Sequence, residues 1–82
     1  MSRWTKVLDQ VRRTPRNVRF ADLCGLVERV GYELDRTRGS HRHYRKPGYP
    51  GINLQAAKGG KAKHYQVRQV LAILDEYELE VD

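Results

Sequence analysis

The stretch RGSHRHYRKPG, residues 38–48, holds residue types from which a small reactive site could be built. It contains three arginines, one lysine, two histidines, one serine and one tyrosine, and no acid. Histidine takes up and releases protons near neutral pH, and guanidinium groups hold a phosphate and stabilise the charge that develops on it. Such a set suits metal-independent cleavage of RNA. There the ribose 2′-hydroxyl attacks the adjacent phosphate while one group removes a proton and another protonates the leaving oxygen.

Strand periodicity sorts these side chains onto two faces of a sheet. Tyr44 is the best core candidate in the segment HRHYRK, residues 41–46, and alternation sends its neighbours to the face that lacks helices. Gly39 is expected to form the tight turn before this strand, where the missing side chain lets a substrate approach the backbone. The open face is then expected to hold these side chains: His41, His43, Arg45, Asn53 and Gln55.

Two other interpretations of the histidines stay open. Both could be ordinary surface residues, because composition alone does not separate a reactive histidine from a solvated one. The H-x-H spacing also points two imidazoles the same way, as a metal pair would. A catalytic zinc site usually takes three protein ligands, and the one further histidine, His64, stands at the start of a predicted helix. We therefore expect no metal site.

A second basic cluster lies in KGGKAKHYQVR, residues 58–68. Lys58, Lys61 and Lys63 stand just before or at the N-terminus of the last predicted helix, where the helix dipole disfavours cations. Three lysines beside free backbone N–H groups predict a phosphate site, and the plainer alternative is a solvated loop. The arginines within residues 12–19 form a looser basic linker, for which plain protein surface is the favoured interpretation.

The balance of charge favours a polyanionic partner. The 82-residue chain has a formal net charge of +6, and its first 74 residues hold all sixteen Lys and Arg residues against five acids, which favours nucleic acid. A single cysteine, Cys24, excludes an internal disulfide, and its place in an apolar helical pattern predicts an inert, buried thiol. No apolar run approaches the length of a membrane span and no signal peptide is visible. We expect a soluble, cytoplasmic protein without a cofactor.

Apolar residues at helical spacing predict two helices in the first part of the chain. One covers Trp4–Val11 with Ser2 as its N-cap, and the second covers residues 20–30 and ends at Gly31. The period then changes to two, which predicts strands over residues 32–38, 41–46 and 52–56. In the first of these strands, the packed face is expected to hold Tyr32, Leu34 and Arg36.

A last amphipathic helix is predicted over residues 67–77. Its apolar stripe consists of Val67, Val70, Leu71, Leu74 and Tyr77. Three strands with one apolar face need a cover, and the helices have complementary stripes. The chain is therefore expected to form a single two-layer α+β domain over residues 1–82, with a three-stranded antiparallel sheet.

Together the segments VGYELDRTRGSHRHYRKPG, INLQ and GGKAKHYQVRQVLAIL resemble the HicA toxins, small bacterial mRNA interferases of type II toxin–antitoxin pairs. The resemblance covers residues 20–77 and leaves residues 1–16 as an N-terminal helical extension. It implies a fold similar to the double-stranded RNA-binding domain, with the order helix-strand-strand-strand-helix. It also implies ribosome-independent cleavage of mRNA, and a HicB antitoxin partner that blocks the active site.

The resemblance makes the histidine of a Gly-Ser-His motif the catalytic residue, which is His41 in this chain. Gly39 then shapes the turn, and Ser40 and His43 are candidate helpers. The candidates for RNA contacts are Arg38, Arg42, Arg45, Lys58, Lys61 and Lys63. Many HicA proteins carry a second histidine in the loop after the third strand, where this chain has Ala57 and Lys58. The alternatives are a non-catalytic RNA-binding or antitoxin-binding module of the same fold, and a degenerate toxin kept for regulation.

Overall fold

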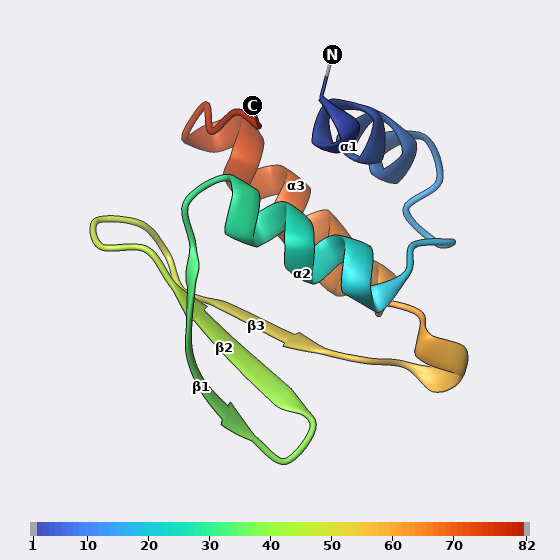
Figure 1. Ribbon diagram of the computed structural model, residues 1–82, viewed down its shortest axis with the longest axis vertical. Coiled ribbons are helices and arrows are strands. Elements are labelled where there is room, and N and C mark those ends of the chain that lie inside the picture. Colours follow the sequence, from blue (N-terminus) through green and yellow to red (C-terminus); the bar gives the residue numbers. More distant parts are fainter. Residues whose placement is uncertain (1, 82) are drawn as a thin grey trace.

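A computed structural model describes residues 2–81 of the chain, and it confirms the predicted α+β fold (Figure 1). The elements in chain order are α1 (Arg3–Arg13), α2 (Phe20–Arg29), β1 (Glu33–Arg38), β2 (His41–Arg45), β3 (Ile52–Gln55), a 3₁₀ turn (Lys58–Gly60) and α3 (His64–Glu76). The three strands form one antiparallel sheet in the order β1-β2-β3. None of the helices within residues 2–81 is long and apolar enough to cross a membrane.

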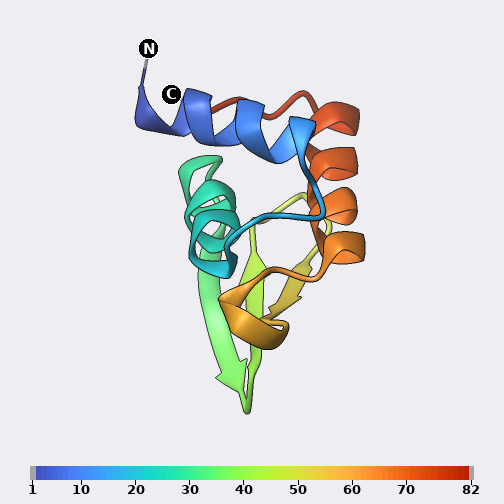
Figure 2. The same ribbon diagram turned by 90° about the vertical axis from the view of Figure 1, so that its right-hand side faces the viewer.

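One face of the sheet is covered by α2 and α3, and the hydrophobic core lies between these layers (Figures 1 and 2). The predicted alternation of β3 is confirmed, because Ile52 and Leu54 are buried while Asn53 is exposed. Tyr44 of β2 is buried at 2% relative exposure, as predicted. The main helical core residues are Leu23, Leu26, Val27, Val67, Val70 and Leu74.

The N-terminal helix α1 lies on the outer side of α2 and α3, away from the sheet (Figure 2). Its predicted cap is confirmed, since Ser2 Oγ accepts a hydrogen bond from the Thr5 N–H at 3.2 Å. The indole of Trp4 packs against α2 at Gly25, where a Cβ atom would stand only 2.1 Å from the ring. A larger residue at this position of α2 would therefore displace the indole and with it the start of α1.

The hairpin turn between β1 and β2 forms as expected. Arg38 and His41 are paired residues, so only Gly39 and Ser40 make the turn. Gly39 has a φ of +58°, in the left-handed region that glycine adopts without strain. A glycine with positive φ at the first central position is typical of the two-residue turns that join antiparallel strands.

The predicted packed face of the first strand is confirmed at Tyr32, which is buried just before β1, and is wrong at Leu34 and Arg36. All six residues from Glu33 to Arg38 are exposed, and Leu34 has 47% of its surface accessible. The strand lies at the edge of the sheet, and its register with β2 shifts between Leu34 and Arg36. Leu34 pairs with Tyr44, whereas Arg36 pairs with His43. The bulge at Asp35 therefore moves Arg36 from the predicted packed face to the face of the histidines.

Tyr77 is a second correction, because it does not belong to the core. It is the C-cap residue of α3 and retains 39% of its accessible surface. Its ring meets Tyr49 edge to face with 5.5 Å between centroids, so the two tyrosines cover one another at the surface. The prediction of a buried Tyr77 continued the helical spacing of α3 by one residue too many, because the helix ends at Glu76.

Cys24 is buried in α2, as predicted, and burial raises the pKa of its thiol. The native protein then holds less thiolate at a given pH than the unfolded chain does, and only the thiolate attacks disulfide reagents. We expect Cys24 to react with Ellman's reagent at pH 8 much more slowly in the native protein than in urea, with the native rate rising at more alkaline pH. Equal rates in buffer and in urea would contradict an inert, buried thiol.

Candidate active site

The two histidines of β2 lie together on the face of the sheet that α2 and α3 leave bare. Tyr44 points into the core, so alternation turns His41 and His43 the other way, as predicted. Their rings stack with centroids 6.4 Å apart and planes 27° apart. Both side chains are half-buried. Nδ1 of His41 is shielded from solvent and has no hydrogen-bond partner among residues 2–81.

A chain of polar side chains fixes the surroundings of His41. Gln55 is the residue paired with His41 across β2 and β3. Its Nε2 donates to Ser40 Oγ at 2.8 Å, and its Oε1 accepts from Lys63 Nζ at 2.6 Å. Ser40, the candidate helper, is thus held beside His41 by an amide. Lys63 brings a positive charge to the same place.

Arginines flank the histidines on the open face. Arg38 is paired with His41 and Arg36 with His43, and paired residues of an antiparallel ladder share a face with Cβ atoms about 5 Å apart. Arg45 lies on this face at the far end of β2, paired with Glu33. Among the described residues, no carboxylate forms an ion pair with Arg36, Arg38 or Arg45, so their charges remain available to an anion.

Arg42 lies on the other side of the sheet. It pairs with Leu54, and its guanidinium stands over the ring of Phe20 in α2 with 5.4 Å between the guanidinium carbon and the ring centroid. A cation at this distance from a ring face is held by the ring's quadrupole. Of the three arginines expected to contact RNA, only Arg38 and Arg45 thus share the face of His41.

The three lysines of the predicted phosphate cluster do not gather at one point. Lys63 is the N-cap residue of α3 and binds Gln55 beside His41. Lys61 instead donates to Asn17 Oδ1, across an isolated bridge between Lys61 and Arg19 that ties this loop to the α1–α2 connection. Lys58 lies exposed in the 3₁₀ turn. Only Lys63 therefore contacts the residues around His41.

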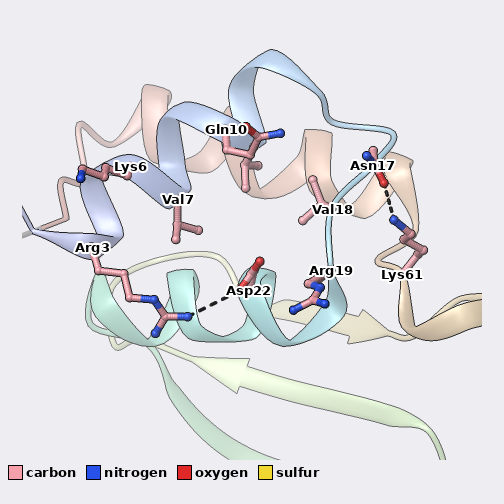
Figure 3. A pocket seen from close by; sticks show the side chains of 10 residues that line it. Arg3, Lys6, Val7, Gln10, Asn17, Val18, Arg19, Asp22 and Lys61 are labelled. Carbon is pink, nitrogen blue, oxygen red and sulfur yellow. Dashed lines mark hydrogen bonds and ion pairs between the residues drawn. The ribbon is translucent and has the colours of Figure 1, made fainter.

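Lys61 lines a separate cavity between α1 and the start of α2 (Figure 3). This cavity has a volume of about 660 Å³, and its apolar lining residues are Val7, Val11 and Val18. Its cations are Arg3, Lys6, Arg19 and Lys61. Arg3 reaches Asp22 at 4.0 Å across one end of the cavity. His41 is not among the lining residues, so this cavity is distinct from the histidine face.

Two arginines of the predicted basic linker, Arg12 and Arg13, lie in the last turn of α1 and form ion pairs within the protein. Arg12 forms two hydrogen bonds with the carboxylate of Asp75, at 2.8 and 3.2 Å, which lower the pKa of Asp75 and attach α1 to the end of α3. Arg13 pairs with Asp9 one turn earlier in α1. These two arginines are thus already engaged within the protein.

A second hollow adjoins His41. It has a volume of about 390 Å³ and lies between β3 and α3. His41, Asn53 and Gln55 line it from the sheet, and Tyr65 and Gln69 line it from α3. Sequence reasoning missed Tyr65, Gln69 and the bulge-shifted Arg36. The tyrosine and glutamine carry no local signal, because only the docking of α3 beside β3 brings them to the histidine (Figure 2).

The third histidine does not join the pair on β2. His64 begins α3, and its ring meets the neighbouring Tyr65. Within residues 2–81, no group of three or more His, Cys, Asp or Glu side chains is arranged to hold a metal ion. The open face presents imidazole, hydroxyl and cationic side chains.

Comparison with known proteins identifies the family to which the chain belongs. A family model described as HicA toxin of bacterial toxin-antitoxin matches residues 20–75. No curated protein and no solved structure gives a significant match. The matched segment begins with α2 and ends within α3, so it contains the whole sheet and leaves α1 outside. Because the match spans more than half of the chain, the protein belongs to the HicA toxin family of bacterial toxin–antitoxin systems.

Proposed function

We propose that this toxin is an endoribonuclease that cleaves mRNA without a metal ion, with His41 as its general acid or base. The observation that carries the proposal is the placement of His41 on the helix-free face of the sheet, opposite Arg38 and beside Lys63-bound Gln55. A proton-transferring imidazole surrounded by unpaired cations is what phosphodiester cleavage requires.

The proposed reaction uses the side chains at these positions. The RNA backbone lies across the open face, where Arg36, Arg38 and Arg45 offer charges to its phosphates. His41 exchanges a proton with the substrate through Nε2, because Nδ1 is shielded. The 2′-hydroxyl gives up its proton as its oxygen attacks phosphorus, and the bond to the 5′-oxygen of the next nucleotide breaks while this oxygen takes a proton. His41 serves one of these two proton transfers and solvent water serves the other. Arg38 stabilises the charge that develops on the phosphate oxygens.

The proposed protein partner is a HicB-like antitoxin that covers this face, in keeping with the antitoxin that the family implies. Arg36, Arg38 and Arg45 have no acidic partner among the described residues, so a partner with acidic side chains would neutralise them. Such a complex would place mRNA and the antitoxin in competition for His41. The proposed site of action is the cytoplasm.

The chemistry of the cleaved ends tests the proposal. Purified protein incubated with an mRNA in excess EDTA is expected to produce fragments with 2′,3′-cyclic phosphate and 5′-hydroxyl ends, because the 2′-oxygen is the nucleophile. An mRNA of the same sequence with 2′-O-methyl riboses should stay intact. Ligation with enzymes specific for each kind of end distinguishes these products from 3′-hydroxyl and 5′-phosphate ends.

The alternative function, an RNA-binding module without cleavage, gives a different result in the same assay. The RNA would shift on a native gel and remain intact. Cleavage that stops when EDTA is added would instead indicate a metal-dependent nuclease. Either outcome would contradict the proposed mechanism.

A further inference from the structure

We propose that the hollow between β3 and α3 binds one unpaired base of the RNA, next to the phosphate that is cleaved, and thereby sets which sequences are cut. The inference rests on the proposed function, since it assigns a substrate subsite to the same active site. Its central residue is Tyr65, with Gln69 and the edge of β3 as the groups that distinguish one base from another.

The hollow lies beside the residues proposed to cleave the RNA. His41 is one of its lining residues, so a group bound there lies next to His41. Gln55 lines the same hollow and carries the hydrogen bonds to Ser40 and Lys63. A nucleotide whose phosphate meets His41 and Lys63 would therefore have its base within reach of this hollow.

Tyr65 supplies a surface for stacking. It lies in the first turn of α3, and 51% of its surface is accessible, although burial of aromatic rings is favourable. Among the described residues, the ring of Tyr65 meets only the adjacent ring of His64, with 6.4 Å between the centroids. Every base has a π-face, so an exposed tyrosine beside a nuclease site is suited to hold a base taken out of a helix.

Amide groups line the hollow where base edges would be recognised. Gln69 lies one turn after Tyr65 on α3 and presents both a donor and an acceptor. The Gln55 N–H points away from β2 and donates to Gln66 Oε1 at 3.0 Å. In a strand, the backbone groups of residues two positions apart point the same way, so the N–H and C=O of Asn53 also face this unpaired edge of β3. Gln66 is buried, and its bond fixes α3 against the strand.

These features favour RNA over a protein segment as the occupant. A purely apolar anchor would leave the amides of Asn53 and Gln69 unpaired, which costs binding energy. A volume of about 390 Å³ accommodates one base with part of its ribose, at the small end of the usual range for ligand pockets. The base must be unpaired, because a duplex keeps its bases stacked inside.

The test measures binding without cleavage. Short RNA oligonucleotides in which every ribose carries a 2′-fluoro group cannot attack their own phosphates, and a set of them varies the base at each position. Affinities from fluorescence anisotropy are compared for wild-type protein, Tyr65→Ala, Tyr65→Phe and Gln69→Ala. Tyr77→Ala is the matched control, an exposed tyrosine that does not line the hollow. Thermal melts establish that each variant is folded.

We expect Tyr65→Ala to weaken binding of the preferred oligonucleotide by about 5- to 150-fold, the usual contribution of one base–aromatic stack, and to reduce the difference in affinity between bases. Tyr65→Phe keeps the ring and should bind like the wild type. Gln69→Ala should change the order of base preference. Tyr77→Ala should change neither affinity nor preference.

The inference is overturned if Tyr65→Ala and Gln69→Ala bind every oligonucleotide as the wild type does. It is also overturned if these variants lose only affinity for the antitoxin, which would make the hollow a protein-binding site. If the wild type cleaves RNA and the variants cut it at the same sites, base recognition in the hollow is refuted while the proposed nuclease activity stands. If the wild type cuts no RNA but the affinity series behaves as expected, the proposed nuclease activity fails while base binding in the hollow stands.

Discussion

His41→Ala is expected to lower the rate of RNA cleavage by about 10²- to 10⁴-fold, the usual contribution of a positioned general acid or base. The substitution removes the imidazole but leaves the cations of the open face in place. His41 is half-buried and its Nδ1 has no hydrogen-bond partner among residues 2–81, so no internal hydrogen bond through that nitrogen is lost. The fold and the affinity for uncleavable RNA should therefore be preserved. Initial rates of cleavage of a labelled mRNA, measured with excess enzyme, give the effect directly.

His43→Ala is the matched control, because His43 lies on the same strand and face and stacks on His41. It should reduce cleavage much less if its role is to support the ring of His41. The two variants should also differ in cells, where His41→Ala abolishes growth arrest on expression without antitoxin. A His41→Ala protein that cleaves RNA at the wild-type rate would refute the proposed mechanism. A His43→Ala protein with the larger defect would transfer the catalytic role to His43.

The faces of β2 and β3 could be predicted from the sequence because burial on one side enforces alternation. Tyr44, Ile52 and Leu54 are apolar and lie against the helices, so a slip of one residue would expose them. His41 is then fixed on the bare face by the same constraint. Gly39 was also predictable, since a two-residue hairpin turn demands a positive φ at this position.

The partners that surround His41 were harder to predict. The bulge in β1 moves Arg36 beside His43, yet nothing in ELDRTR marks the extra residue, because this edge strand buries no side chain that would fix its register. Tyr65 and Gln69 reach the site through the packing of α3 on β3, a contact between distant elements. Local periodicity carries no information about either arrangement.

The lysine cluster illustrates the same limit. The spacing of Lys58, Lys61 and Lys63 correctly indicated a basic segment before α3, but their directions depend on tertiary pairing. Lys61 forms an isolated bridge with Arg19 and donates to Asn17, whereas Lys63 turns to Gln55. Lys61 therefore lies at the cavity between α1 and α2, whereas Lys63 lies beside the histidines of β2. A helix N-terminus with nearby lysines in sequence therefore does not by itself predict a single phosphate site.

Tyr44→Ala is expected to destabilise the protein by about 3–5 kcal/mol, the usual loss when a buried aromatic side chain is removed. The ring is 2% exposed, lies on the middle strand of the sheet and reaches Glu28 of α2, so its removal leaves a cavity under α2. The total stability of an 82-residue domain is about 4–12 kcal/mol, so this loss takes from about a quarter of the stability to all of it. Urea denaturation followed by circular dichroism measures the difference in unfolding free energy.

Tyr44→Phe separates packing from hydrogen bonding. The Tyr44 hydroxyl donates to Glu28 Oε2 at 3.0 Å, and burial raises the pKa of Tyr44, which keeps this phenol protonated as a donor. Since Glu28 is exposed and can bind water instead, the loss of this bond should cost about 1 kcal/mol. Tyr44→Phe should therefore still cleave RNA, because His41 keeps its place on the opposite face of β2. Equal destabilisation by Ala and Phe would show that the hydroxyl, and not the packed ring, holds β2 against the helices.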